Sequence, residues 1–369
     1  MTSGPADQLP GYAAPDVKSS LLAAGVSGTI YSLVMPESEA ALLSLVSEAE
    51  ALLDRYREPW TQKQDPMHQA YFDRWIEWAA PVVSFDPAAF GFRYPTAGAS
   101  EGIFKLTAEY ARGCAARGAE PTIHIFEGEY EGFPAYADAL KLRCLRHDRS
   151  EWRDLPAAID RDGLMWISQP SAIDGNVWDH FDAFVALLAE QRRDVTVIPD
   201  LTYVGSVGRA FSVCLDSPNV PAFVMSHSKP FGGYYHRVGG VFSRAEVPSL
   251  FGNKWFKNLL SLAWGTEMMR RHGVFDLPRK YRAVQEEAAA RAGEALGVEL
   301  EAADVLLIAT ASPEGARTEP LRSVLRGSPS EQRIRLCLTP AMTSLISPYL
   351  APTTAPELLR EWAHKEPGR

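Results

Sequence analysis

Residues 226–239 read Ser-His-Ser-Lys-Pro-Phe-Gly-Gly-Tyr-Tyr-His-Arg-Val-Gly, and this stretch decides the fold. It places Lys229 between two serines, with Arg237 eight residues further along the chain. The preceding apolar run, Ala222-Phe223-Val224-Met225, predicts a short buried strand. Such a strand would deliver Lys229 to a loop at its carboxyl end, where open α/β sheets bind their ligands. The segment therefore predicts a ligand-binding loop at the edge of an α/β sheet.

The residue types around Lys229 point to a cofactor that carries both a carbonyl group and a phosphate. A lysine that forms a Schiff base must lose its proton part of the time, so it needs a dry setting and neighbouring cations or hydrogen-bonding groups. Ser226 and Ser228 offer hydroxyl groups to phosphate oxygens, and Arg237 offers a guanidinium fork to the same dianion. We therefore predict that Lys229 holds pyridoxal phosphate. The alternative is a solvated lysine in a glycine-rich loop.

A second part of the site is predicted upstream, where Val195-Thr196-Val197-Ile198-Pro199 indicates a buried strand that ends at Asp200. Pyridoxal chemistry requires an anion beside the ring nitrogen, because the protonated ring withdraws electrons from the substrate. Asp200 can supply that anion, and the Tyr203 hydroxyl can hydrogen-bond the phenolic oxygen of the ring. The alternative is an aspartate that ends a strand and starts a turn.

A third part is the small-residue segment Thr96-Ala97-Gly98-Ala99-Ser100-Glu101-Gly102, which precedes a helical pattern. The start of a helix presents free backbone N–H groups and the positive end of the helix dipole. Gly98, Ala99 and Ser100 would therefore face a phosphate. The alternative is an ordinary helix cap, which small residues also make.

In this order, the three parts resemble the fold-type I pyridoxal phosphate enzymes, and most closely the class I/II aminotransferase family. The resemblance covers residues 90–245 best. It implies that Lys229 forms the internal aldimine, that Asp200 pairs with the pyridinium and that Tyr203 contacts the phenolic oxygen. It also assigns the phosphate to the backbone at Ala99 and Ser100 and to the side chains of Ser226, Ser228 and Arg237.

Two further roles follow from the resemblance. Tyr130 matches the aromatic residue that stacks on the cofactor ring, and the alternative is an ordinary core or surface tyrosine. Arg335 matches the arginine that binds the substrate carboxylate, because a planar guanidinium fits a planar carboxylate. Its alternative is a solvent-facing arginine on an edge strand.

One segment departs from the family pattern. The family carries an Asn-Pro-x-x-Pro-x-Gly-like stretch whose inner asparagine also hydrogen-bonds the phenolic oxygen. Here the stretch reads Gln169-Pro170-Ser171-Ala172-Ile173-Asp174-Gly175-Asn176, with Ala172 at the asparagine position. Alanine cannot donate a hydrogen bond, so either Asn176 reaches the cofactor from a shifted loop or Tyr203 acts alone. The second case would alter the protonation of the cofactor and the fate of the substrate carbanion.

Composition fits an ordinary globular enzyme. The 369 residues are 46% hydrophobic and 22% charged, with a formal charge of −9 that argues against binding nucleic acid or an anionic membrane surface. No stretch reaches the roughly 18 apolar residues of a membrane span. The four cysteines and eight histidines show no metal-ligand spacing, so no metal site is predicted. We expect a cytoplasmic protein.

The pattern of elements predicts an α/β fold, and the family resemblance implies that it is the aminotransferase fold type I. Strands are predicted near residues 121–126, 163–168, 195–199, 221–226 and 239–243, and helices at 37–57, 179–193, 253–271 and 279–297. Their alternation predicts a large domain with a mostly parallel sheet covered by helices. Runs at 305–308 and 334–338 predict strands of a smaller α+β domain. The expected divisions are 1–60 (N-terminal arm and helix contributing to the small domain), 61–275 (large domain) and 276–369 (small domain).

These inferences favour an aminotransferase acting on an amino acid. The first alternative is a pyridoxal phosphate enzyme that keeps its aldehyde, as in β- or γ-substitution, decarboxylation or carbon–carbon bond formation. A second is a cofactor-binding regulator, which the charge and residues 1–36 disfavour, because such regulators carry a DNA-binding helix pair. A homodimer is expected from the family resemblance.

Overall fold

The computed structural model of the chain describes residues 15–57, 65–255 and 258–346. Within these ranges the strands form one sheet of seven strands, one of four and one of two. The polar N-terminal arm (1–14) and the end of the predicted small domain (347–369) lie outside the described residues.

The α-helices are α1 (Pro15–Ala23), α2 (Pro36–Ser47), α3 (Ala49–Arg57), α4 (Asp65–Ala79), α5 (Ala99–Ala116), α6 (Gly132–Ala139), α7 (Leu155–Ala158), α8 (Phe181–Gln191), α9 (Leu259–Arg271), α10 (Asp276–Lys280), α11 (Arg282–Leu296), α12 (Glu319–Arg322) and α13 (Thr339–Ile346). The 3₁₀ helices are η1 (Arg149–Glu151), η2 (Pro248–Trp255) and η3 (Pro313–Gly315). The strands are β1 (Val83–Ser84), β2 (Phe92–Thr96), β3 (Thr122–Phe126), β4 (Arg143–His147), β5 (Leu164–Ser168), β6 (Thr196–Asp200), β7 (Val213–Cys214), β8 (Ala222–Ser226), β9 (Gly239–Ser243), β10 (Glu301–Ala302), β11 (Ile308–Ala311), β12 (Leu325–Arg326) and β13 (Arg333–Cys337).

The large sheet has the order β2-β9-β8-β6-β5-β3-β4. Its neighbouring strands are parallel except where β9 pairs with β2 and with β8. This arrangement confirms the predicted fold class, an α/β fold with a mostly parallel large sheet. Five of the sheet's strands were predicted to within two residues at each end, because their apolar runs are short and bounded by polar or turn residues.

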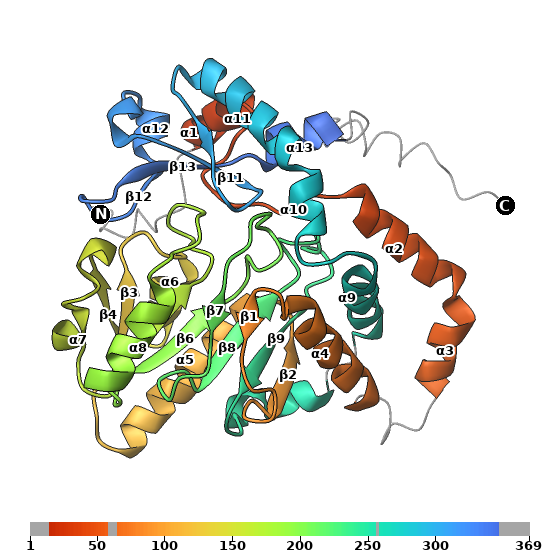
Figure 1. Cartoon of the computed structure of the whole chain (residues 1–369), viewed down its shortest axis with the longest axis vertical. Helices are drawn as coiled ribbons and strands as arrows, with labels where there is room; N and C mark the ends of the chain where they lie inside the picture. The colour runs from red at the N-terminus through yellow and green to blue at the C-terminus, as the bar shows by residue number, and fades with distance from the viewer. Residues whose placement is uncertain (1–14, 58–64, 256–257, 347–369) are drawn as a thin grey trace, which may run out of the picture.

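Helices cover both faces of the large sheet (Figure 1). On β5, Leu164 and Trp166 pack toward α5 and α6, whereas Met165 and Ile167 pack into the core on the other face. Residues of α4, α8 and α9 contribute to that second core. Burial on both faces explains why the strands are continuously hydrophobic rather than alternating.

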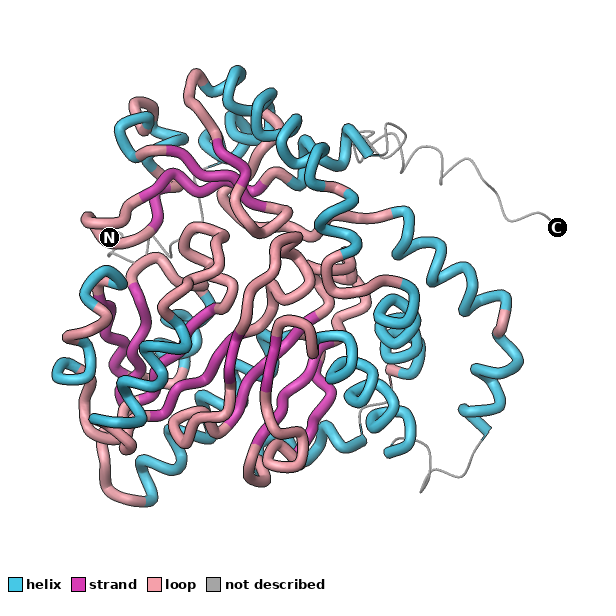
Figure 2. The backbone as a smooth tube through the Cα atoms, viewed as in Figure 1, coloured by secondary structure: helices cyan, strands magenta, loops and turns pink. Residues whose placement is uncertain are grey.

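The four-stranded sheet is antiparallel, with the order β10-β11-β13-β12, and lies above the large sheet in Figure 1. The N-terminal segment joins it, since Ser27 pairs with Cys337 and α1 contacts α12. Loops from the large sheet lie between the two sheets, as Figure 2 shows. The exact domain limits at residues 60 and 275 stay a prediction.

The run Val305-Leu306-Leu307-Ile308 was predicted as a strand, and this prediction is wrong: β11 begins only at Ile308. The cause is the buried side chain of Gln285 on α11. Its Nε2 donates to the carbonyls of Ala303, Val305 and Ile308 at 3.1, 3.0 and 3.0 Å. These bonds hold the segment in a turn, so it cannot extend into a ladder.

Two predicted helices are each divided. The helix predicted over 37–57 is interrupted at Glu48, between α2 and α3. The Ser47 hydroxyl donates to the Ser44 carbonyl at 2.6 Å, and such side-chain bonds compete with the helical pattern. The helix predicted over 279–297 is interrupted at Tyr281, between α10 and α11.

A third helix begins later than predicted. The prediction was 253–271, but η2 runs to Trp255 and α9 begins at Leu259. Asn258 caps α9, because its Oδ1 accepts a hydrogen bond from the Ser261 amide at 3.1 Å.

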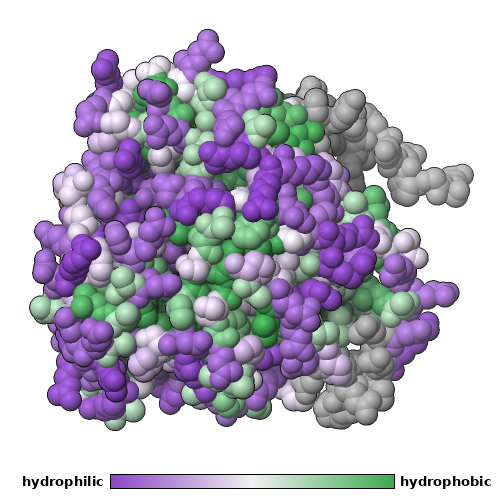
Figure 3. All heavy atoms as spheres, viewed as in Figure 1, coloured by the Kyte–Doolittle hydropathy of each residue, from purple (hydrophilic) through white to green (hydrophobic). Residues whose placement is uncertain are grey.

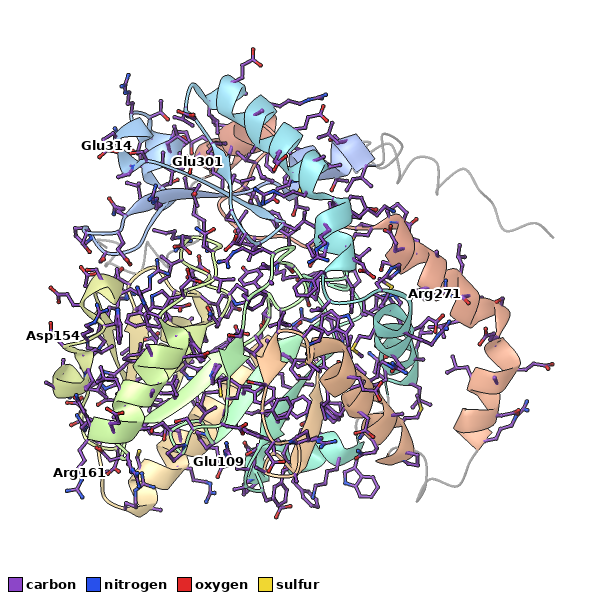
Figure 4. The ribbon with its side chains drawn as sticks, viewed as in Figure 1. Glu109, Asp154, Arg161, Arg271, Glu301 and Glu314 are labelled. Atoms are coloured by element: carbon purple, nitrogen blue, oxygen red, sulfur yellow. The ribbon has the colours of Figure 1, made fainter. Side chains whose placement is uncertain are left out.

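The surface is mostly hydrophilic on the face seen in Figure 3, with apolar residues gathered near its middle. Charged residues such as Asp154, Arg161 and Glu314 lie at the rim in Figure 4. Among the described helices, none is long and apolar enough to cross a membrane.

Candidate active site

A cavity of about 220 Å³ lies at the carboxyl ends of the large sheet's parallel strands. The predicted site residues that line it are Ala99, Ser100, Tyr130, Asp200, Tyr203, Ser226, Ser228, Lys229, Arg237 and Arg335. They come from segments that span more than 230 positions of the sequence, and most lie at or within four residues of the end of β2, β3, β6 or β8. The structure therefore gathers most of the predicted residues in one place, while their roles stay predictions.

Lys229 lies three residues beyond the end of β8 and borders the cavity. Burial lowers the pKa of its ammonium group to about 8, and the charges of Arg237 and Arg335 act in the same direction. Its Nζ donates to the Ile30 carbonyl at 2.5 Å, so the N-terminal segment reaches over the lysine. An amine with this pKa is neutral often enough near pH 8 to attack a carbonyl.

Asp200 is the last residue of β6 and is buried. Burial raises the pKa of its carboxyl group to about 6, although hydrogen bonds from Thr202 oppose the shift. The Thr202 amide and hydroxyl donate to Asp200 Oδ1 at 3.0 and 2.5 Å. These bonds fix the orientation of a carboxylate that lines the cavity and could pair with a cationic ring nitrogen.

The groups predicted to hold a phosphate lie at the start of α5 and around β8. Ser226 Oγ donates to Ser228 Oγ at 3.1 Å, and both serines are buried. Arg237 Nη2 donates to the Ala97 carbonyl at 2.8 Å, next to Gly98. Arg237 has a φ of 47°, in the left-handed region that arginine rarely adopts. Outliers of this kind cluster at functional sites.

Gly98 does not line the cavity but shapes its wall. Its φ is 86°, and a Cβ there would lie 3.1 Å from Arg237 Nη2. Ala97 N donates to Glu101 Oε2 at 2.7 Å, which holds the turn that starts α5. Glycine at position 98 thus lets the guanidinium of Arg237 sit against the start of the helix.

Two tyrosines that are far apart in the sequence, Tyr130 and Tyr203, line the cavity. The Tyr130 hydroxyl lies 3.3 Å from Ser100 Oγ, and burial raises the pKa of Tyr130 above its usual value. Burial also raises the pKa of Tyr203, so both phenols stay protonated and can donate hydrogen bonds at neutral pH.

Arg335 on β13 is almost fully buried and lines the cavity. Its Nη1 donates to the Ala172 carbonyl at 2.6 Å, and its Nη2 donates to the Gly28 carbonyl at 3.2 Å. Nη2 also lies 3.4 Å from Glu131 Oε1. Its Nε has no hydrogen-bond partner among the described residues, which leaves a donor for an incoming anion.

Asn176 is not brought into the cavity, contrary to the first of the two possibilities for this segment. Its Oδ1 accepts a hydrogen bond from the Asp304 amide at 3.0 Å, which ties it to the turn before β11. Ala172 lines the cavity instead. Of the two donors proposed for the phenolic oxygen of the cofactor, Asn176 and Tyr203, only Tyr203 therefore lines the cavity.

Sequence reasoning missed several lining residues, namely Thr29, Ile30, Ile103, Glu131, Ser168, Thr202 and Tyr234. Thr202 and Tyr234 lie within a few residues of predicted positions, so proximity in the sequence could have suggested them. Thr29 and Ile30 come from the N-terminal segment, and nothing in their residue types signals a site. Glu131 follows Tyr130 directly and is the lining acid, besides Asp200, in the described part of the chain.

The residues present fit pyridoxal phosphate. A lysine with a lowered pKa, a buried carboxylate and a phenol border a common cavity. Two buried serine hydroxyls, the start of α5 and the guanidinium of Arg237 could together hold a phosphate, and we call these groups the anion cradle. Among the described residues no group of His, Cys, Asp and Glu side chains is arranged to hold a metal ion.

The sequence matches no family model and no curated protein. Solved structures nevertheless share the fold across most of the chain. An Escherichia coli protein with a methionine aminotransferase function is 16% identical, with a TM-score of 0.64 over 94% of this chain and 100% of that one. Histidinol-phosphate aminotransferase from Sinorhizobium meliloti, in complex with pyridoxal 5′-phosphate, is 14% identical, with a TM-score of 0.61 over 95% of each chain.

A third structure is the pyridoxal phosphate-bound C–S lyase from Staphylococcus hominis. It is 13% identical, with a TM-score of 0.56 over 75% of this chain and 79% of that one. The likeness to these three proteins is one of fold. It confirms the prediction that the chain has the fold of the type I aminotransferases.

Proposed function

We propose that the protein is a pyridoxal phosphate-dependent aminotransferase that acts on an amino acid. The observation that carries this proposal is the placement of Lys229, whose pKa is lowered to about 8, in one cavity with the buried Asp200 and with Arg237. Lys229 is the candidate for covalent attachment of the cofactor, Asp200 for pairing with its ring nitrogen and Arg237 for binding its phosphate. The fold is one that such enzymes use.

The cofactor, when bound, supplies an aldehyde that condenses with amines and a ring that withdraws electrons from the substrate α-carbon. Lys229 Nζ would hold the cofactor and, once released, take the proton from the substrate α-carbon. Asp200 would keep the ring nitrogen protonated, and Tyr203 would donate to the phenolic oxygen. Ser226, Ser228 and Arg237 would hold the phosphate.

Arg335 would orient the substrate by its carboxylate, and the stacked Tyr130 would fix the plane of the ring. The lining is largely apolar at Ile30, Ile103 and Ala172, so it limits water near the reacting carbon. A cytoplasmic homodimer is part of the proposal and rests on the family resemblance. Analytical ultracentrifugation would test the dimer.

The experiment that tests the function is a spectroscopic half-reaction. Purified protein is loaded with pyridoxal phosphate, and single amino acids are added without a keto acid. An aminotransferase should lose the absorbance of the lysine-bound cofactor as its amine form accumulates, and a keto acid should restore it. Lys229→Ala should abolish the covalent attachment, read as a borohydride-stable mass adduct, whereas Lys254→Ala on the surface should retain it.

A second candidate is an enzyme that returns the cofactor to its aldehyde form, such as a C–S lyase. Ala172 in place of a hydrogen-bonding asparagine favours it, since loss of one donor to the phenolic oxygen changes the protonation of the cofactor. In the same experiment this enzyme would release product from a single amino acid while the original absorbance returned unaided.

A further inference from the structure

Three charged residues form a cluster at the side of the cavity where Arg335 lies. Arg326 of β12 and Arg335 of β13 both contact one carboxylate oxygen, Glu131 Oε1. Arg326 Nη2 is the nearer partner, and Arg335 Nη2 lies 3.4 Å away. Glu131 and Arg335 line the cavity, whereas Arg326 lies behind Glu131 and does not. Glu131 therefore stands between the cavity and the second arginine.

Backbone geometry holds this cluster together. Gly128, three residues before Glu131, has a φ of 86°, and Gly327, directly after Arg326, has a φ of 92°. A Cβ at Gly128 would lie 2.3 Å from the amide nitrogen of Gly327. The segments that carry Glu131 and Arg326 thus contact each other at Gly128 and Gly327. This close approach places Glu131 next to Arg326.

Both arginines are buried, at 9% and 2% exposure for Arg326 and Arg335. Buried cations need a partner charge, because isolation from water is costly. With one carboxylate for two guanidinium groups, the cluster carries a net charge of +1 from Arg326, Arg335 and Glu131. One carboxylate from a ligand would balance it. Nε of Arg335, which lines the cavity, lacks a partner among the described residues, so a donor remains for that carboxylate.

A second ligand carboxylate finds no such partner. Among the described lining residues, the other cations are Lys229 and Arg237, which the proposed function commits to the cofactor. Once one carboxylate has balanced the cluster, a side-chain carboxylate would be buried in the cavity without a counter-charge.

We propose that Glu131 is a specificity-determining residue that restricts the substrate to amino acids with one carboxylate and an uncharged side chain. It does so by neutralising Arg326, which would otherwise attract a second carboxylate. This inference rests on the proposed function and specifies the substrate class for the same site.

The test compares two unreactive ligands of equal shape, glutarate and its monoamide glutaramate, by calorimetry on the cofactor-loaded protein. The wild-type protein should bind glutaramate roughly tenfold more tightly than glutarate. Glu131→Gln should shift that ratio toward glutarate by about tenfold or more, because Arg326 then lacks its anion. The rates of the spectroscopic half-reaction with glutamine, glutamate and lysine should change in the same sense.

Three variants control for folding and for nonspecific charge effects. Glu131→Asp keeps the charge and should keep the preference for glutaramate. Glu127→Gln removes a partly exposed acid of the same loop, which faces Arg146 at 3.9 Å, and should leave the ratio unchanged. Arg326→Gln leaves the cluster without net charge and should weaken the binding of both ligands.

The proposal would be overturned by a wild-type protein that prefers glutarate, by fastest reaction with lysine, or by a ratio that Glu131→Gln leaves within twofold. Failure of the proposed function looks different: no amino acid would change the absorbance of any variant. If the glutaramate preference and its reversal still appeared, charge selection by Glu131 would stand without aminotransferase activity.

Discussion

At the scale of single residues, Lys229 illustrates how burial prepares a side chain for chemistry. Its pKa falls to about 8 because the surrounding protein disfavours the charged form. An exposed lysine keeps a value near 10.5 and is almost wholly protonated at neutral pH. The fold thus converts an ordinary cation into an amine that is available as a nucleophile.

This shift predicts a pH dependence for cofactor capture. Only the neutral amine reacts, so the rate at which the cofactor-free protein binds pyridoxal phosphate covalently should rise roughly tenfold per pH unit below pH 8 and level off above it. Stopped-flow absorbance from pH 6 to 10 measures this rate. Nα-acetyl-lysine amide serves as the reference amine. A midpoint near 10.5 for the protein would contradict the expectation.

Asp200 gives a second prediction at this scale. Asp200→Asn should keep the covalent link to Lys229 but lower the rate of the amino acid half-reaction by about two to three orders of magnitude, because a neutral amide cannot hold the ring nitrogen protonated. Absorbance reports the retained cofactor and stopped-flow reports the rate. The exposed Asp138→Asn provides the control, and equal rates in the two variants would refute the role of Asp200.

The sequence could indicate Lys229 and Asp200 because each lies at or just after the end of a short apolar strand, and Arg237 because it follows Lys229 by eight residues in the same glycine-rich segment. Glu131 was beyond reach for a physical reason. Its significance arises from contact with Arg326 and Arg335, which lie 195 and 204 residues further along the sequence and reach it only through folding. Local patterns carry no information on such pairings.

At the scale of elements, helix α5 packs closely on the large sheet at Gly102. A Cβ there would lie 2.7 Å from Val241 Cγ2. Gly102→Ala should therefore lower the free energy of unfolding by about 1–2 kcal/mol, despite the better helix propensity of alanine. At Gly113 on the same helix, a Cβ would meet only the flexible end of Arg117, at 3.4 Å. Gly113→Ala should raise stability by roughly 0.5–1 kcal/mol.

Urea denaturation of both variants measures this difference. Equal changes at the two positions would show that α5 does not pack as tightly as described. Because α5 carries Ala99 and Ser100 at its first turn, Gly102→Ala should also weaken phosphate binding, whereas Gly113→Ala should not.

Five strands of the large sheet were predictable because both of their faces are apolar, which gives an unambiguous run of residues. The other two, β2 and β4, carry exposed or half-buried residues and were not predicted. Residues 305–307 have the same composition and yet lie in a turn before β11. The difference lies in Gln285 of helix α11, whose side-chain amide donates hydrogen bonds to three backbone carbonyls in that region. Element type therefore depends on tertiary contacts wherever a polar side chain competes for backbone groups.

At the scale of the whole molecule, Arg149 connects the large sheet to the small one. It donates to Glu331 Oε2 at 2.9 Å, to Ser171 Oγ at 3.0 Å and to Asp174 Oδ2 at 2.8 Å. Glu331 lies between β12 and β13, and the 171–174 segment carries Ala172, which contacts Arg335. The Arg149 side chain thus links the small sheet, the large sheet and the segment that forms one wall of the cavity.

We expect Arg149→Met to lower the free energy of unfolding by about 2–3 kcal/mol, because it leaves two carboxylates without their cation. Arg143→Met removes a cation that is half exposed and lies 3.6 Å from Asp160, so it should change stability by less than about 0.5 kcal/mol. Thermal unfolding with and without cofactor measures both. If Arg149→Met left the stability unchanged, the two sheets would have to be held together by other contacts.

The left-handed backbone at Arg237 carries a consequence for any attempt to improve this protein. Glycine or asparagine would occupy that conformation at less cost, so arginine there lowers the stability of the folded state by about 1 kcal/mol. Selection for heat resistance alone would favour replacing it, and the replacement would remove the guanidinium that we propose as a phosphate ligand. At this position, higher thermal stability would come at the expense of ligand binding. Engineering for stability should therefore keep Arg237 and make its substitutions elsewhere in the protein.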